Sequence, residues 1–146
     1  MTQENKDLLL KDLCSRLPYG VKIELTWWVM GEGTCINTAL EPDHIEQLLN
    51  DEDGDAEIKP YLRPMSSMTE EEFNKLKEYS GLKYDQLDLA SFQNGTYKCL
   101  DFYLSEVPSG AVIRVFDWLN RYHFDYRDLI PMDLAIAVTK ENDPYK

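Results

Sequence analysis

The chain has 146 residues, of which 43% are hydrophobic and 29% charged, as in an ordinary folded domain. These values exclude a disordered chain, and no apolar run approaches the roughly 20 residues that a membrane-spanning helix needs. The 27 acidic and 15 basic side chains give a formal net charge of −12, which opposes direct binding to nucleic acid. The first seven residues lack the basic start and apolar middle of a signal peptide, so we expect a cytoplasmic protein.

The first element is an expected amphipathic helix. Leucines repeat at positions i, i+4 and i+8 over residues 4–17, and Pro18 ends the run. We expect Cys14 to pack on the apolar side of this helix, with Asp12 and Arg16 on its other faces.

A β-hairpin is expected next. Apolar and polar residues alternate over 21–30, residues 34–40 are strand-like, and the glycines within 31–33 suit a three-residue loop. Trp27 and Trp28 then point to opposite sides of the first strand. One of them is available as an exposed binding anchor, or it is covered by a helix of the same chain, which is the arrangement we favour.

A short helix over 43–49, capped by Asp43, and an extended segment over 56–63 follow. Pro60 and Pro64 have no amide donor, which restricts the extended segment to a sheet edge or to a position outside a sheet.

The second half of the chain contains the clearest helix signals. Thr69 and Glu72 form a T-x-x-E capping box for a helix over 69–79, and Gly81 is placed to end it. Helical spacing returns over 112–122.

Asp125 is expected to cap one helical turn over 126–129, and the apolar run 134–138 to form a closing strand. We therefore predict the α+β class, with residues 1–146 as a single compact domain in which a small antiparallel sheet packs with three or four helices.

Acidic residues concentrate over 41–57, where eight acids occur without a single lysine or arginine. Such a segment is either a solvated surface or a negative patch for a basic partner, and the first is the more common. Asp51, Asp53 and Asp55 match positions 1, 3 and 5 of a calcium-binding EF-hand loop, but the glycine of position 6 is Ala56 and the glutamate of position 12 is missing. No metal site is predicted.

The cysteines and histidines also argue against a metal centre. Cys14, Cys35 and Cys99 are odd in number and far apart, which fits neither a disulfide framework nor a metal site, so we expect reduced and mostly buried thiols. His44 and His123 are too distant in sequence to form a zinc-binding helix motif. Glycine-rich nucleotide motifs are missing too, and no cofactor is predicted.

His123, Asp125 and Arg127 are the weak catalytic candidates. Asp125 is placed to orient the imidazole, and Arg127 to bind a carboxylate. The more common role of such residues is structural: a helix-end histidine and a capping aspartate hold a corner of the fold. For Arg63 and Arg127 we favour internal salt bridges over a partner site.

Three stretches carry a resemblance: KDLCSRLPYGVK at 11–22, KPYLRPMSSMTEEE at 59–72, and DWLN followed by HFDYRDLI within 117–130. The chain resembles a group of small uncharacterised proteins of gut bacteria and their phages, whose members usually have glycine where this chain has Asp128 and Asp133. A difference in turn geometry is expected there. The resemblance implies a cytoplasmic accessory protein of prophage origin and supplies no substrate, cofactor or catalytic residue.

Three hypotheses follow. The first is a non-catalytic protein-binding or accessory protein of a bacterial mobile element or phage, with an unidentified protein partner, for which a basic protein is one candidate. The second is an acidic decoy that occupies a nucleic-acid-binding protein, and the third is a small enzyme. Oligomeric state stays open. The candidate partner-binding residues are Trp28, Asp51, Asp53 and Asp55, and the catalytic candidates are His123, Asp125 and Arg127.

Overall fold

The structure is a computed structural model that describes residues 1–51, 54, 56–81, 88–95 and 109–146. Contacts divide the chain into two compact units: a sheet unit, Met1–Leu62 with Arg127–Lys146, and a helical unit, Arg63–Tyr126. The α+β class is confirmed, because these residues form five α-helices and a four-stranded sheet. That residues 1–146 make one domain stays a prediction.

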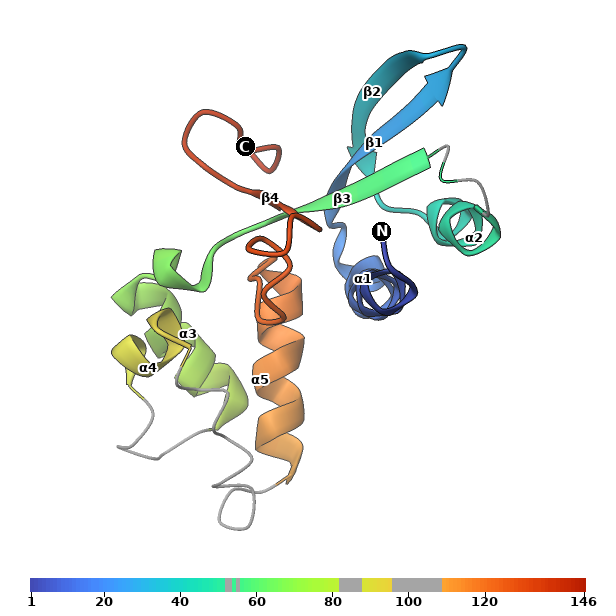
Figure 1. Cartoon of the computed structure of the whole chain (residues 1–146). Coiled ribbons are helices and arrows are strands. Elements are labelled where there is room, and N and C mark those ends of the chain that lie inside the picture. The colour runs from blue at the N-terminus through green and yellow to red at the C-terminus, as the bar shows by residue number, and fades with distance from the viewer. Residues whose placement is uncertain (52–53, 55, 82–87, 96–108) are drawn as a thin grey trace. The chain divides into compact units, whose positions relative to one another are not determined.

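The sheet has the strand order β2-β1-β3-β4 (Figure 1). Strand β1, Lys22–Val29, pairs antiparallel with both β2, Glu32–Ala39, and β3, Ala56–Leu62. Strand β4, Ile136–Ala137, is parallel to β3, so the sheet is mixed where a purely antiparallel one was expected. The chain leaves β3 and returns only after a long connection, which is what parallel neighbours require.

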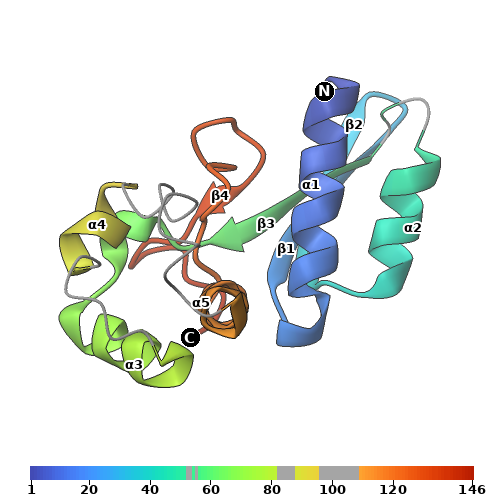
Figure 2. The same cartoon turned by 90° about the horizontal axis from the view of Figure 1, so that it is seen from below.

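Two helices cover one face of this sheet: α1, Gln3–Arg16, and α2, Pro42–Asn50, which lie side by side in Figure 2. A 3₁₀ turn, Leu17–Tyr19, follows α1. The apolar core between helices and sheet removes large aliphatic side chains from water, which is the main stabilising contribution to the unit. Its fully buried members include Leu9, Leu13, Val21, Ile23, Leu62 and Leu129.

The expected faces of α1 need correction. Cys14 is exposed, whereas Asp12 and Arg16 are completely buried. Arg16 Nε donates to Asp12 Oδ2 at 2.8 Å, and Arg127 Nη1 donates to Asp12 Oδ1, also at 2.8 Å. The buried charges are therefore paired and hydrogen-bonded, as a low-dielectric interior requires.

The expected hairpin is present, but its turn is not the expected three-residue loop. Val29 pairs directly with Glu32, which leaves Met30 and Gly31 as a two-residue turn. Their φ angles are 55° and 82°, and two positive values are typical of a type I′ turn, whose twist matches that of the strands. Gly33 lies within β2 instead.

The helical unit contains α3, Glu70–Ser80, α4, Leu89–Gln93, and α5, Ser109–Arg121, together with a 3₁₀ turn at Met65–Ser67. Helices α3 and α5 pack side by side (Figure 1). The core of this unit is rich in aromatic rings. Its buried residues include Met68, Phe73, Leu76, Phe92, Trp118 and Phe124.

The predicted capping box is confirmed. Thr69 Oγ1 accepts from the Glu72 amide at 3.2 Å, and Glu72 Oε1 accepts from the Thr69 amide at 3.0 Å. Gly81 ends α3 with a φ of 74°. Within the described residues, no helix is long and apolar enough to cross a bilayer.

Candidate partner-binding site

Trp28 lies near the end of β1, directly opposite Gly33 of β2. A Cβ atom at Gly33 would lie 3.0 Å from the indole Nε1, so the missing side chain gives the indole room against the β2 backbone. Trp28 is 44% exposed, whereas Trp27 packs against the core on the opposite side of the strand. The favoured arrangement, in which a helix of the same chain covers the ring that faces away from the core, is therefore wrong for Trp28.

The rest of the hairpin is exposed as well. Met30 is 99% exposed and Ile36 is 43% exposed. All residues from 31 to 37 are exposed. Apolar side chains near the turn are thus available to another molecule.

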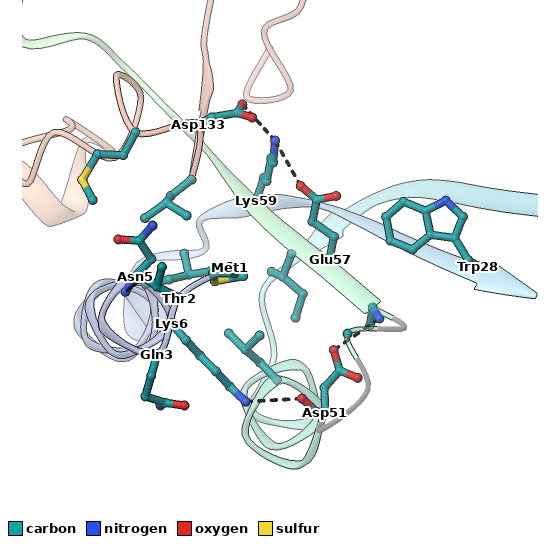
Figure 3. Close-up of a pocket in the computed structure, with 17 residues that line it drawn as sticks. Met1, Thr2, Gln3, Asn5, Lys6, Trp28, Asp51, Glu57, Lys59 and Asp133 are labelled. Atoms are coloured by element: carbon teal, nitrogen blue, oxygen red, sulfur yellow. Dashed lines mark hydrogen bonds and ion pairs between the residues drawn. The ribbon is translucent and has the colours of Figure 1, made fainter. Parts of the chain in front are cut away.

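A cavity of about 700 Å³ opens beside Trp28, wholly within the sheet unit (Figure 3). This Trp28 cavity is bounded by the first turns of α1, the end of α2, β3 and residues 132–134. Its volume is within the range of ligand-binding pockets. The apolar side chains that line it include Leu9, Leu48, Ile58 and Leu134.

Asp51 lines the same cavity and follows the last residue of α2. Its Oδ2 accepts a hydrogen bond from the Ala56 amide at 3.3 Å, and its backbone carbonyl accepts one from Lys6 Nζ at 3.4 Å (Figure 3). A second hollow of about 590 Å³ shares both Trp28 and Asp51. Two residues predicted independently as partner-binding candidates, Trp28 and Asp51, therefore line the same cavity. Asp53 and Asp55 lie outside the described residues.

Lys59 is held between two carboxylates at the far side of the cavity. Its Nζ lies 3.0 Å from Asp133 Oδ1 and 3.1 Å from Glu57 Oε1 (Figure 3). Burial opposes the charged form, but the hydrogen bonds to Asp133 and Glu57 outweigh it and raise the pKa of Lys59 above its usual value. The Asp133 side chain is 90% exposed, so its carboxylate faces solvent.

Sequence reasoning missed this cluster. Glu57 and Lys59 are two positions apart in a strand and therefore point to the same side, which is a usable signal. Asp133 is 74 residues from Lys59, and no local pattern connects the two.

Arg127 has a structural role in the sheet unit. Its guanidinium bonds Asp12, as described above, and lies 3.4 Å from Ser15 Oγ. The favoured internal salt bridge is thus confirmed for Arg127.

His123 and Asp125 flank a corner of the helical unit. The Arg63 amide donates to the His123 carbonyl at 2.7 Å, and the Asp125 amide donates to the Arg63 carbonyl at 2.9 Å. The helical turn expected over 126–129 is not formed, because Asp128 has a φ of 60°, in the left-handed region, which a right-handed helical turn does not contain.

Arg63 itself forms the other internal bridge that we favoured. Its guanidinium bonds both carboxylate oxygens of Glu72, with 2.8 Å from Nη2 to Oε1, and lies 4.3 Å from the centre of the Phe124 ring. None of the three catalytic candidates lines the Trp28 cavity.

Comparison of the chain with protein-family models, with curated proteins and with solved structures finds no match in any of the three.

Proposed function

We propose that this chain is a non-catalytic accessory protein that binds another protein through the Trp28 cavity. The observation that carries the proposal is the position of Trp28, which is 44% exposed at the edge of a cavity that Asp51 also lines. Exposed tryptophans beside a pocket are typical anchors of protein interfaces, because a few such side chains supply most of the binding energy.

Two features favour binding over catalysis. The Arg127 guanidinium is committed to the buried Asp12, and the Lys59 ammonium is neutralised by Glu57 and Asp133. Both cations are therefore held in ion pairs within the sheet unit. A cytoplasmic setting in a bacterial mobile element or phage is part of the proposal, and the resemblance of the three sequence stretches supports it.

Affinity capture from host lysate tests the proposal. We compare the unmodified chain with Trp28→Ala and with Ile113→Ala, a matched control because Ile113 is 68% exposed but belongs to the helical unit. Loss of an interface anchor costs about 2 kcal/mol or more, so Trp28→Ala is expected to reduce capture roughly 30-fold, with the control unchanged. Equal capture by Trp28→Ala would contradict the proposal.

The same capture, repeated at ~0.15 M and ~1 M salt, distinguishes the acidic-decoy hypothesis from binding through the Trp28 cavity. A basic partner that is lost at high salt, released by neutralising Asp51, Asp53 and Asp55, and indifferent to Trp28→Ala would favour the decoy. A partner held at both salt concentrations and lost with Trp28→Ala would favour the Trp28 cavity.

A further inference from the structure

Strand β3 has an open edge. Strand β4 pairs only with Tyr61 and Leu62, so residues 56–60 have β1 on one side and no described strand on the other. The Leu62 carbonyl accepts from the Val138 amide at 2.8 Å on the β4 side. Backbone groups of alternate residues point to the same side of a strand, so Ile58 and Ala56 direct theirs to this edge.

Asp51 occupies part of this edge. Its carboxylate accepts from the Ala56 amide, in the position that the carbonyl of an adjacent strand would take. Lys6, through its bond to the Asp51 carbonyl, holds the residue in place. Among the described residues, the edge at Ala56 is therefore capped by the Asp51 side chain and not by a further strand.

The Trp28 cavity runs along the open edge, with residues 56–59 on one side and the first two turns of α1 on the other (Figure 3). Ile58 points toward the apolar core, whereas Glu57 and Lys59 point to the opposite face. The surroundings of the edge are thus apolar on one face and charged on the other.

The charged face is acidic overall. Glu57 and Asp133 share one ammonium, that of Lys59, which leaves one negative charge in excess. The net charge of the chain, −12, has the same sign. A cation brought to this face gains attraction from both carboxylates, and an anion is repelled.

We propose that the open edge of β3 binds an extended segment of the partner as an added strand, whose side chains alternate between apolar and basic. This inference rests on the proposed function, because it names the chemistry of the partner at the Trp28 cavity. The added strand bonds the backbone of Ile58 and displaces the Asp51 carboxylate from Ala56. Its apolar side chains contact the core side of the edge, and its basic side chains meet Glu57 and Asp133. Strand addition gives affinity through the backbone and specificity through alternate side chains.

A synthetic peptide of about seven residues, alternating valine and lysine, tests the inference with the full chain. Calorimetry is expected to show binding about tenfold or more tighter than that of the same peptide with glutamate in place of lysine, and amide NMR shifts at Ala56 and Ile58. A peptide with a central proline, which removes one amide donor, is expected to bind more weakly. Equal binding of the lysine and glutamate peptides, or shifts confined to other residues, would overturn the inference.

Variants of the chain separate a specific site from general attraction to an acidic protein. Glu57→Gln with Asp133→Asn is expected to weaken peptide binding about fivefold or more, while Glu70→Gln with Glu71→Gln, equal in charge but located in the helical unit, is expected to change little. Similar effects of the two pairs would overturn the inference.

Asp51 offers a second contrast. Asp51→Asn removes the charge but keeps an oxygen that accepts from Ala56, whereas Asp51→Ala removes both. Since the edge must be uncapped for a strand to bind, Asp51→Ala is expected to bind the lysine peptide several times more tightly than Asp51→Asn. Equal or weaker binding by Asp51→Ala would count against strand addition.

The partner experiment distinguishes this inference from the function on which it rests. Capture that is lost with Trp28→Ala but unchanged by Glu57→Gln with Asp133→Asn would overturn the added strand and leave the proposed function standing. Capture unchanged by Trp28→Ala would overturn the proposed function itself.

Discussion

Asp12 accepts hydrogen bonds from two arginines inside the sheet unit, and no other described carboxylate is as deeply buried with two cationic partners. Asp12→Ala would remove the carboxylate to which the buried Arg16 donates at 2.8 Å. Breaking a buried pair in this way costs about 3–5 kcal/mol, and we expect that decrease in the free energy of unfolding. Urea denaturation measures it.

The control for this change is Asp7→Ala, because Asp7 is an exposed acid of the same helix. Its effect is expected to stay within about 0.5 kcal/mol. A loss below about 1 kcal/mol for Asp12→Ala would show that the buried cluster contributes little to stability.

Glu72 links stability to pH in the helical unit. Burial opposes its ionisation, but the hydrogen bonds from Arg63 and from Thr69 outweigh burial and lower the pKa of Glu72. A carboxyl with a lowered folded-state pKa stabilises the fold above its unfolded pKa of about 4.3, and this contribution is lost as the pH falls through the lowered value.

Glu72→Gln should therefore lower the free energy of unfolding by about 1–2 kcal/mol at pH 7 and cause a smaller loss at pH 3. Denaturant titrations at the two pH values measure the difference. An equal loss in the free energy of unfolding at both pH values would contradict this prediction, because the effect would then not come from the charge of Glu72.

Among the elements, the β1–β2 hairpin depends on an unusual turn residue. Met30 has a φ of 55°, which is costly for most side chains and which asparagine tolerates better. Its side chain is 99% exposed, so replacing it loses almost no packing. Met30→Asn is expected to raise the free energy of unfolding by about 0.5–1 kcal/mol, as measured by urea denaturation.

Gly31→Ala is the opposing variant, because a φ of 82° strains any side chain. It should destabilise the chain. A Met30→Asn protein no more stable than the unmodified chain would indicate that the strain at this turn is relieved in another way.

Elements with local signals could be predicted from the sequence. The capping box at Thr69 and the glycine at 81 define α3 without help from the rest of the chain. The hairpin turn could not be located, because Met30 is not a typical turn residue and the glycine at 33 makes room for Trp28 instead. Local chemistry identified the hairpin but not its turn.

The parts of the candidate site that could not be predicted depend on contacts between residues that are far apart in the sequence. Trp28 and Asp51 were predicted from residue type and charge, but their shared cavity follows from the arrangement of β1, β3 and α2. The Lys59 to Asp133 bridge and the Asp12 to Arg127 bridge join positions 74 and 115 residues apart. Asp133 and Asp128 have φ values of 58° and 60°, in the left-handed region that aspartate tolerates better than most residues.

At the scale of the whole molecule, the candidate binding residues that the structure describes all belong to the sheet unit. The helical unit holds the aromatic core and the Arg63 to Glu72 bridge, and its exposed residues therefore serve as controls. We therefore expect contact with the partner to depend on the surface around Trp28 and not on the helical unit.

The most direct test places a photo-crosslinking benzoylphenylalanine at position 28 and, in a second protein, at position 113, which is also exposed but lies in the helical unit. After irradiation in host cells, we expect a discrete crosslinked adduct with another protein from position 28 and none of that mass from position 113. No adduct from position 28, or the same adduct from both positions, would contradict protein binding through the Trp28 cavity.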